Sequence, residues 1–191
     1  LIGFGKKERT SYTAKKSFII IGGTDALMLL GLALAWKLTG EIKMSDISIA
    51  LNSKAAILSY ICFAAGAFAK AGAMPFHTWV PDVAEDAPTP VTAFLPASLD
   101  KLLGIYFLAR ISLDLFKLNF GMNTFLMVIG SFTIVAAVMM ALIQHDLKRL
   151  LGYHAVSQVG YMVLGIGTGN PIGIAGGLFH HERTKTRKGK D

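Results

Sequence analysis

Long apolar stretches alternate along the chain with short segments that gather its charges. Residues 118–144 contain no Asp, Glu, Lys or Arg, and neither do residues 150–181. A helix that crosses the hydrocarbon core of a bilayer needs about 20 predominantly apolar residues. The pattern therefore predicts an all-α, polytopic transmembrane helix bundle, with spans at about 17–36, 55–80, 91–110, 123–143 and 150–169.

Both ends of the chain add partial elements to this bundle. Leu1–Phe4 looks like the end of an earlier helix, and residues from 172 onward look like the start of a later one. We expect residues 1–180 to form one partial transmembrane domain. The tail HERTKTRKGKD (181–191) is basic and has no apolar face, so we expect it to stay outside the membrane. A truncation, a frame shift or an abnormal chain end would explain such a tail.

Composition narrows the class of protein further. Of the 191 residues, 53% are apolar and 16% are charged, whereas a soluble domain carries about a quarter charged residues. The net charge of +7 suggests nucleic acid as a partner, but no basic stripe with interleaved aromatic residues supports that reading. Cys62 is the only cysteine, which excludes disulfides within the chain and thiolate metal sites.

The distribution of Lys and Arg over the loops predicts the orientation of the bundle. Residues 5–16 carry five basic side chains against one acidic side chain, so we expect this loop to be cytoplasmic. Successive crossings then place residues 81–90 and 144–149 on the same side. Residues 37–54 and 111–122 would lie on the opposite side.

Ionisable residues inside the predicted spans are the first candidates for function. Asp25 lies in the middle of one apolar run, Lys70 ends a second, and Lys101 lies inside a third. A central charge costs about 2.5–3.5 kcal/mol on insertion scales, so such residues tend to face the bundle interior and to line ion paths or proton relays. The alternatives are a structural ion pair, or a lysine whose ammonium reaches the membrane surface.

A helix break is predicted directly after Lys70. Gly72 and Pro75 follow it in the proline-rich sequence KAGAMPFHTWVPDVAEDAPTP (70–90). They should interrupt the helix and free backbone carbonyls beside the lysine, as broken helices do at the ion sites of transporters. An ordinary proline kink is the alternative. We therefore expect a discontinuous helix near Lys70–Pro75.

Histidines are weaker candidates, because a membrane histidine is as often a packing residue as a proton shuttle. His77 follows the predicted break, and His180 lies near the end of the apolar sequence. A metal site built from His77 and the acidic residues of 81–90 matches no ligand spacing. The glycine-rich residues 165–170 follow no predicted strand, so they do not indicate a nucleotide loop. We predict no catalytic group, no metal and no bound cofactor.

Two blocks of sequence are specific enough to resemble a known family. The first is KAGAMPFHTWVPDVAEDAPTPV (70–91), continued by SLDKLLGIYFLAR (98–110), and the second is HDLKRLLGYHAVSQVGYMVLGIG (145–167). They resemble the antiporter-like subunits shared by respiratory complex I, Mrp-type Na⁺/H⁺ antiporters and group 4 membrane-bound hydrogenases. The resemblance extends to about His180 and ends at the basic tail. SLDKLLGIYFLAR is most similar to the hydrogenase and Mrp branches.

The resemblance implies a fold of inverted repeats, each with a broken helix, of which this chain would be one part. It implies that a glutamate on an earlier helix pairs with Lys70 and that Lys101 passes the proton onward. Asp25 matches an acidic residue near that pair, and His180 matches a histidine at the start of a later helix. The glutamate would precede Leu1, so the chain by itself should not translocate protons.

The expected function is proton or cation translocation by a non-catalytic, multi-pass subunit of a redox-driven complex, of hydrogenase or complex-I type, in the plasma or inner membrane. Its partners would be the lipid bilayer, other membrane subunits, and H⁺ or Na⁺, with no nucleic acid. A subunit of a secondary Na⁺/H⁺ antiporter of Mrp type is the alternative, since it shares every motif above. A membrane scaffold whose charges are purely structural is an alternative of another class.

Overall fold

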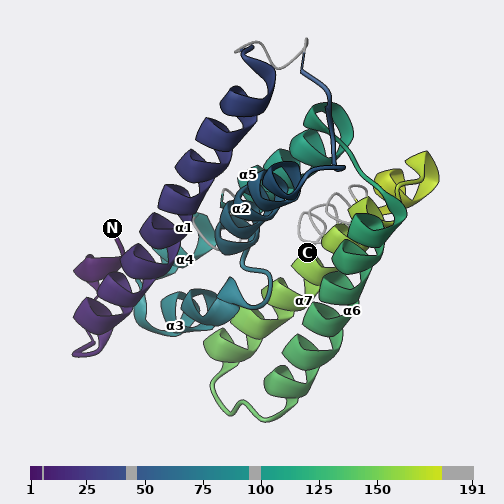
Figure 1. The fold of residues 1–191 in the computed structure, drawn as a ribbon. Helices are drawn as coiled ribbons and strands as arrows, with labels where there is room; N and C mark the ends of the chain where they lie inside the picture. The colour runs from purple at the N-terminus through teal and green to yellow at the C-terminus, as the bar shows by residue number, and fades with distance from the viewer. Residues whose placement is uncertain (6, 42–46, 95–99, 178–191) are drawn as a thin grey trace.

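Helices account for most of the chain that the computed structural model describes, which comprises residues 1–5, 7–41, 47–94 and 100–177. Figure 1 shows how they are arranged. The helices are α1 (Thr10–Thr39), α2 (Lys54–Ala71), α3 (Trp79–Asp86), α4 (Thr89–Phe94), α5 (Asp100–Arg110), α6 (Phe120–Leu142) and α7 (Leu147–Gly167). Shorter elements are 3₁₀ turns at Ile2–Phe4 and Phe76–Thr78, a π-helical turn at Ile111–Leu115, and the strands β1 (Ile49–Ala50) and β2 (Phe116–Lys117).

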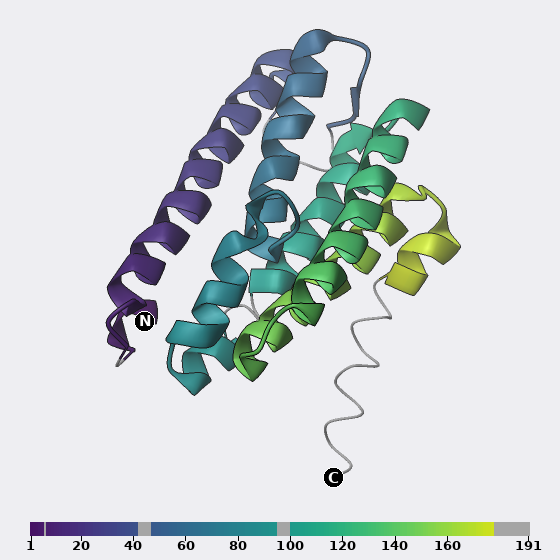
Figure 2. The same ribbon diagram turned by 90° about the horizontal axis from the view of Figure 1, so that it is seen from below.

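The predicted all-α membrane bundle is confirmed. Among the described residues, three segments are long and apolar enough to cross a membrane, namely Thr10–Thr39, Lys54–Asp86 and Phe120–Leu142. The helix α1 lies along one flank and packs on α2, whereas α6 and α7 form a pair on the other flank, with α5 against α2 (Figure 2). The α6–α7 pair is close, since a Cβ on Gly130 would lie 2.9 Å from the carbonyl oxygen of Gly160.

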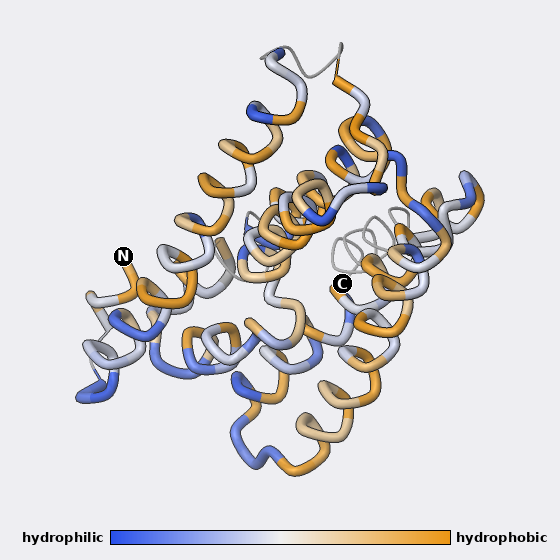
Figure 3. Tube along the Cα trace, viewed as in Figure 1, coloured by the Kyte–Doolittle hydropathy of each residue, from blue (hydrophilic) through white to orange (hydrophobic). Residues whose placement is uncertain are grey.

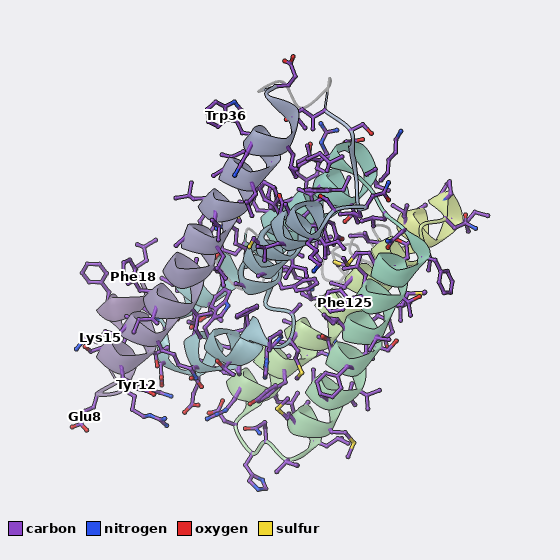
Figure 4. All side chains as sticks on the ribbon, in the orientation of Figure 1. Glu8, Tyr12, Lys15, Phe18, Trp36 and Phe125 are labelled. Carbon is purple, nitrogen blue, oxygen red and sulfur yellow. The ribbon has the colours of Figure 1, made fainter. Side chains whose placement is uncertain are left out.

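The outer face of α1 has the features of a helix in a bilayer. Tyr12 and Phe18 point away from the bundle near one end of α1, and Trp36 does so near the other end (Figure 4). Tyr12 is 62% exposed and Trp36 59% exposed. Tyr and Trp are enriched at the two membrane–water interfaces, because their rings are apolar and their tips polar. The positions of these residues fit a helix that crosses the full thickness of the bilayer.

The helix α1 begins at Thr10, earlier than the apolar run from residue 17 predicts. Its polar first turns contact α3 instead of lipid: the Thr13 hydroxyl donates to the Asp86 carboxylate at 2.7 Å, and the Lys16 ammonium lies 2.6 Å from the Asp82 carboxylate. Hydrophobic length marks only the part of a helix that lies in hydrocarbon. The polar extension therefore escapes a prediction that is based on hydropathy.

Ion pairs gather the first, third and fifth loops at one end of the bundle. Lys7 lies 3.6 Å from Glu85, and Arg149 lies 3.2 Å from Glu85 and 3.6 Å from Asp82. We call Lys7, Lys16, Asp82, Glu85, Asp86 and Arg149 the end cluster. The turn between α6 and α7 and the turn directly before α1 are hydrophilic in Figure 3, and the helices are largely apolar along their length. Residues 5–16, 81–90 and 144–149 thus share one side, as the loop order predicts.

The opposite end is held by backbone pairing. The strands β1 and β2 are parallel, with Ile49 opposite Phe116 and Ala50 opposite Lys117. Beneath them, the Tyr60 ring packs edge-on against Phe116 at 5.3 Å between centroids, and its hydroxyl lies 2.9 Å from the Ser112 hydroxyl. The loops 37–54 and 111–122 therefore meet at the end where the predicted order of crossings places both.

The third predicted span, residues 91–110, is not described as one helix. The structure has α4 at Thr89–Phe94 and α5 at Asp100–Arg110, and residues 95–99 lie outside the described part. At the C-terminus, residues 171–177 are helical. His180 and the predicted basic tail at 181–191 also lie outside the described residues.

Candidate functional site at an interrupted helix

The second apolar segment is interrupted, which confirms the expected discontinuous helix near Lys70–Pro75. The helix α2 ends at Ala71, and Gly72 takes a left-handed conformation with φ of 80°. The carbonyl of Phe68 accepts the N–H groups of both Gly72 and Ala73, each at 2.8 Å. This arrangement is a common end for a helix, and glycine favours it because it has no Cβ. The chain then turns through Pro75, whose peptide bond with Met74 is cis.

Side chains from other elements hold the backbone at the break. The indole nitrogen of Trp79, at the start of α3, donates to the carbonyl of Ala69 at 2.9 Å. The backbone N–H of Met74 donates to the Thr133 hydroxyl of α6 at 3.3 Å. Buried backbone groups that leave a helix need such partners, because an unpaired one is costly. Hydrogen bonds with α3 and α6 therefore stabilise the interruption of the helix.

Lys70 lies in the last turn of α2, one residue before that helix ends, and its ammonium forms an ion pair with the Asp25 carboxylate of α1. The two side chains are 27% and 44% exposed, respectively. Asp25 also lines a hollow together with residues 1–3 and Gly22. The structure thus brings together two of the predicted site residues, and it leaves one side of the pair open.

Lys101 lies in the first turn of α5 and is only 7% exposed. Its helix crosses α2 at Gly104, where a Cβ would lie 2.4 Å from the backbone nitrogen of Ala71. Only a glycine allows two helices to approach so closely. Lys101 therefore lies on the helix that packs against the end of α2, next to the turn that carries Lys70.

The remaining predicted residues are less closely associated with the pair. His77 lies in the 3₁₀ turn after the break, half-buried, with its ring 6.5 Å from the Tyr153 ring of α7. The break separates His77 from the face of α2 that carries Lys70. His180 is outside the described residues. The proton-handling roles of Lys70, Lys101, Asp25, His77 and His180 stay predictions.

Sequence reasoning missed three groups at this site: Trp79, Thr133 and Asp100. The carboxylate of Asp100 interacts electrostatically with the Lys70 ammonium from the α5 side. The adjacency of Asp100 to Lys101 was visible in the sequence, but the packing of α5 on α2 was not. No group of three His, Cys, Asp or Glu that could hold a metal occurs in the part of the chain that the structure describes.

Comparison with known proteins places this arrangement in a family. The chain is 35% identical over 175 residues to NADH-quinone oxidoreductase subunit N of Heliobacterium modesticaldum, covering 90% of this chain and 37% of that protein. It is 37% identical over 184 residues to subunit L of Campylobacter jejuni, covering 94% of this chain and 30% of that one. The chain thus spans about a third of the length of these relatives.

A solved structure shows the same fold. A chain in the Mrp complex from Dietzia sp. DQ12-45-1b superposes with a TM-score of 0.85 at 23% identity, covering 91% of this chain and 33% of that chain. A family model described as NADH:quinone oxidoreductase/Mrp antiporter, TM, matches residues 1–182. With its interrupted second span and this match over nearly its whole length, the chain belongs to the NADH:quinone oxidoreductase/Mrp antiporter transmembrane family.

Proposed function

We propose that the full-length protein translocates protons across the plasma or inner membrane as a subunit of a multisubunit, redox-driven complex. In this proposal Lys70 is the central proton carrier of residues 1–177. The relatives at 35% and 37% identity are subunits of NADH-quinone oxidoreductases, which supports the redox-driven assignment. Partner subunits, the bilayer and H⁺ are the interacting species that this function requires.

One observation carries the proposal: Lys70 lies in the last turn of the interrupted helix α2, and its ammonium pairs with the carboxylate of Asp25 on α1. While the pair is closed, the carboxylate stabilises the protonated amine. When the carboxylate moves away, desolvation favours the neutral amine, which gives up its proton. Because α2 ends beside Lys70, a small movement of α1 or of the last turn of α2 changes the distance between these charges without bending a continuous helix.

A secondary Na⁺/H⁺ antiporter subunit is the second candidate function. Its support is the likeness to the Mrp complex chain, which at 23% identity concerns the fold alone. The relatives above 30% identity are named as NADH-quinone oxidoreductase subunits, which favours the redox-driven complex. Replacing K⁺ by Na⁺ in the transport assay separates the two, because only the antiporter moves protons in exchange for Na⁺ without electron transfer.

The test is Lys70→Met in the full-length protein, assembled in its complex and sealed in membrane vesicles. We expect proton uptake, followed with a pH-sensitive dye, to fall about tenfold or more, since a positioned proton carrier contributes roughly 100-fold in enzymes. Lys54→Met is the matched control, because Lys54 is an exposed lysine at the other end of the same helix. Normal proton uptake in Lys70→Met would refute the proposal and leave the structural scaffold as the better explanation.

A further inference from the structure

Asp100 is the first residue of α5 and immediately precedes Lys101. It lies four residues before Gly104, so the two residues share a face of the helix. A Cβ on Gly104 would lie 2.8 Å from the carbonyl oxygen of Ala67 and 2.9 Å from the Cα of Ala71. The face of α5 that carries Asp100 is therefore the face that packs on the last turn of α2.

This packing brings a second carboxylate within electrostatic range of Lys70. Asp25 forms the direct ion pair from α1, and Asp100, half-buried, interacts electrostatically with the same ammonium from α5. Asp114, a carboxylate just beyond the end of α5, lies in a different environment. It is 2.7 Å from Arg110, and the side chains of Asp114 and Arg110 are 43% and 47% exposed. Of Asp100 and Asp114, it is Asp100 that interacts electrostatically with Lys70 and directly precedes Lys101 in the sequence.

Resting on the proposed function, we propose that Asp100 is a proton carrier between Lys70 and Lys101. In the first step the Lys70 ammonium gives its proton to the Asp100 carboxylate, which leaves a neutral amine and a carboxylic acid. In the second step the acid gives that proton to the neutral amine of Lys101, which restores the carboxylate and forms an ammonium. No other reactant is consumed, and the net result is the movement of one proton from α2 to α5.

The chemistry of the three groups favours this order of transfer. Two ammonium groups repel one another and neither accepts a hydrogen bond, so Lys101 must be neutral when it receives the proton, and a carboxylate near Lys70 provides a relay between the two amines. A carboxylate accepts from one lysine and, once protonated, donates to the other. Its negative charge also stabilises whichever lysine holds the proton. A purely structural role is the rival explanation, since an acidic residue in the first turn of a helix is stabilised by the helix dipole.

The experiment compares Asp100→Asn, Asp100→Glu and the control Asp114→Asn in the full-length protein, within its complex in sealed vesicles. We expect Asp100→Asn to lower proton translocation about tenfold or more, and Asp100→Glu to retain most of it, because glutamate keeps the titrating group. Asp114→Asn should translocate as the unmodified protein does. Infrared difference spectra during turnover should show a protonated carboxylic acid that is lost in Asp100→Asn, shifted in Asp100→Glu and unchanged in Asp114→Asn.

The outcomes separate this inference from the proposed function. If Lys70→Met abolishes translocation while Asp100→Asn translocates like Asp114→Asn, Asp100 is not a carrier and the proposed function stands. If Lys70→Met translocates normally, the proposed function itself fails. Should Asp100→Asn not assemble, the infrared comparison of Asp100→Glu with the unmodified complex decides, and an unshifted carboxylic acid signal overturns the inference.

Discussion

The ammonium of Lys70 and the carboxylate of Asp25 meet across the interface between α2 and α1, one residue before α2 ends. Each charge alone would be costly within the membrane, and the pair reduces that cost.

Removing the Asp25 carboxylate should disable Lys70 without altering the helix break. We expect Asp25→Asn to lower proton translocation by the full-length protein about tenfold or more, because the ammonium loses its paired carboxylate. Dye-detected proton uptake by vesicles measures the effect. Asp114→Asn removes an equal charge from an exposed pair and should leave uptake unchanged. Equal uptake in both variants would contradict a role for Asp25.

Lys101 should need a side chain that can lose its proton. We expect both Lys101→Met and Lys101→Arg to lose most proton translocation, because guanidinium keeps its proton throughout the physiological range. Lys117→Arg is the control: Lys117 is exposed in β2, at the end opposite the end cluster. Translocation that survives in Lys101→Arg but not in Lys101→Met would mean that only the charge of Lys101 matters.

Gly72 should tolerate no side chain, for two separable reasons. Its φ is 80°, and a Cβ would lie 2.6 Å from the Cγ2 of Val80. Gly40 has a similar φ of 71°, with open space around a Cβ. We expect Gly40→Ala to lower the free energy of unfolding by about 1–2 kcal/mol, and Gly72→Ala to lower it by about 1–3 kcal/mol more.

Unfolding of the purified protein in detergent, followed by circular dichroism, measures both glycine variants. Val80→Ala removes the methyl group that a new Cβ would meet. The double variant Gly72→Ala/Val80→Ala should therefore lose less stability than the sum of the two single changes. Equal effects of Gly72→Ala and Gly40→Ala would show that α3 shifts freely to make room.

The start of α7 should give a pH-dependent contribution to stability. Asp146 caps this helix by accepting the backbone N–H of Arg149 at 3.0 Å, and that bond holds the pKa of Asp146 below its ordinary value. A lowered folded-state pKa stabilises the fold above the ordinary pKa of about 3.9. The contribution is lost as the pH falls through the lower, folded-state value.

Thermal unfolding at pH 7 and at stepwise lower pH tests this cap. Asp146→Ala should be less stable than the unmodified protein at pH 7, and the difference should shrink below about pH 4, the ordinary pKa region of aspartate. Asp146→Asn keeps a capping oxygen that does not titrate. A deficit in Asp146→Ala that stays constant over the whole pH range would exclude the titration of this carboxylate as its cause.

Much of the fold follows from local sequence, and the exceptions have physical reasons. Uninterrupted apolar runs define α1, α2 and α6, and Gly72 with Pro75 defines the break. The polar first turns of α1 were missed, because they pack on the acids of α3, a partner that lies more than 60 residues away in sequence, with separations of 66 and 73.

The site was predictable only in part for the same reason. Charges inside apolar runs singled out Lys70, Lys101 and Asp25 as candidates. The resemblance implied an earlier glutamate as the partner of Lys70, with Asp25 only near that pair, whereas in this chain Asp25 itself pairs with Lys70. Nothing local indicates that Trp79 hydrogen-bonds back across the break, or that Gly104 brings α5 onto α2. Such contacts depend on how helices cross, and helix crossing is set by side chains from several segments together.

The end cluster also has a consequence for biogenesis. Lys16 pairs with Asp82, which is synthesised 66 residues later, so at about 5–20 residues per second the acid follows the lysine out of the ribosome by several seconds. Lys16, in the first turns of α1, is therefore unpaired while that helix enters the membrane, when positive charge directs its orientation. The charge of Lys16 is neutralised only after α3 has been made. The same side chain therefore first helps to orient α1 during insertion and then stabilises the contact between α1 and α3.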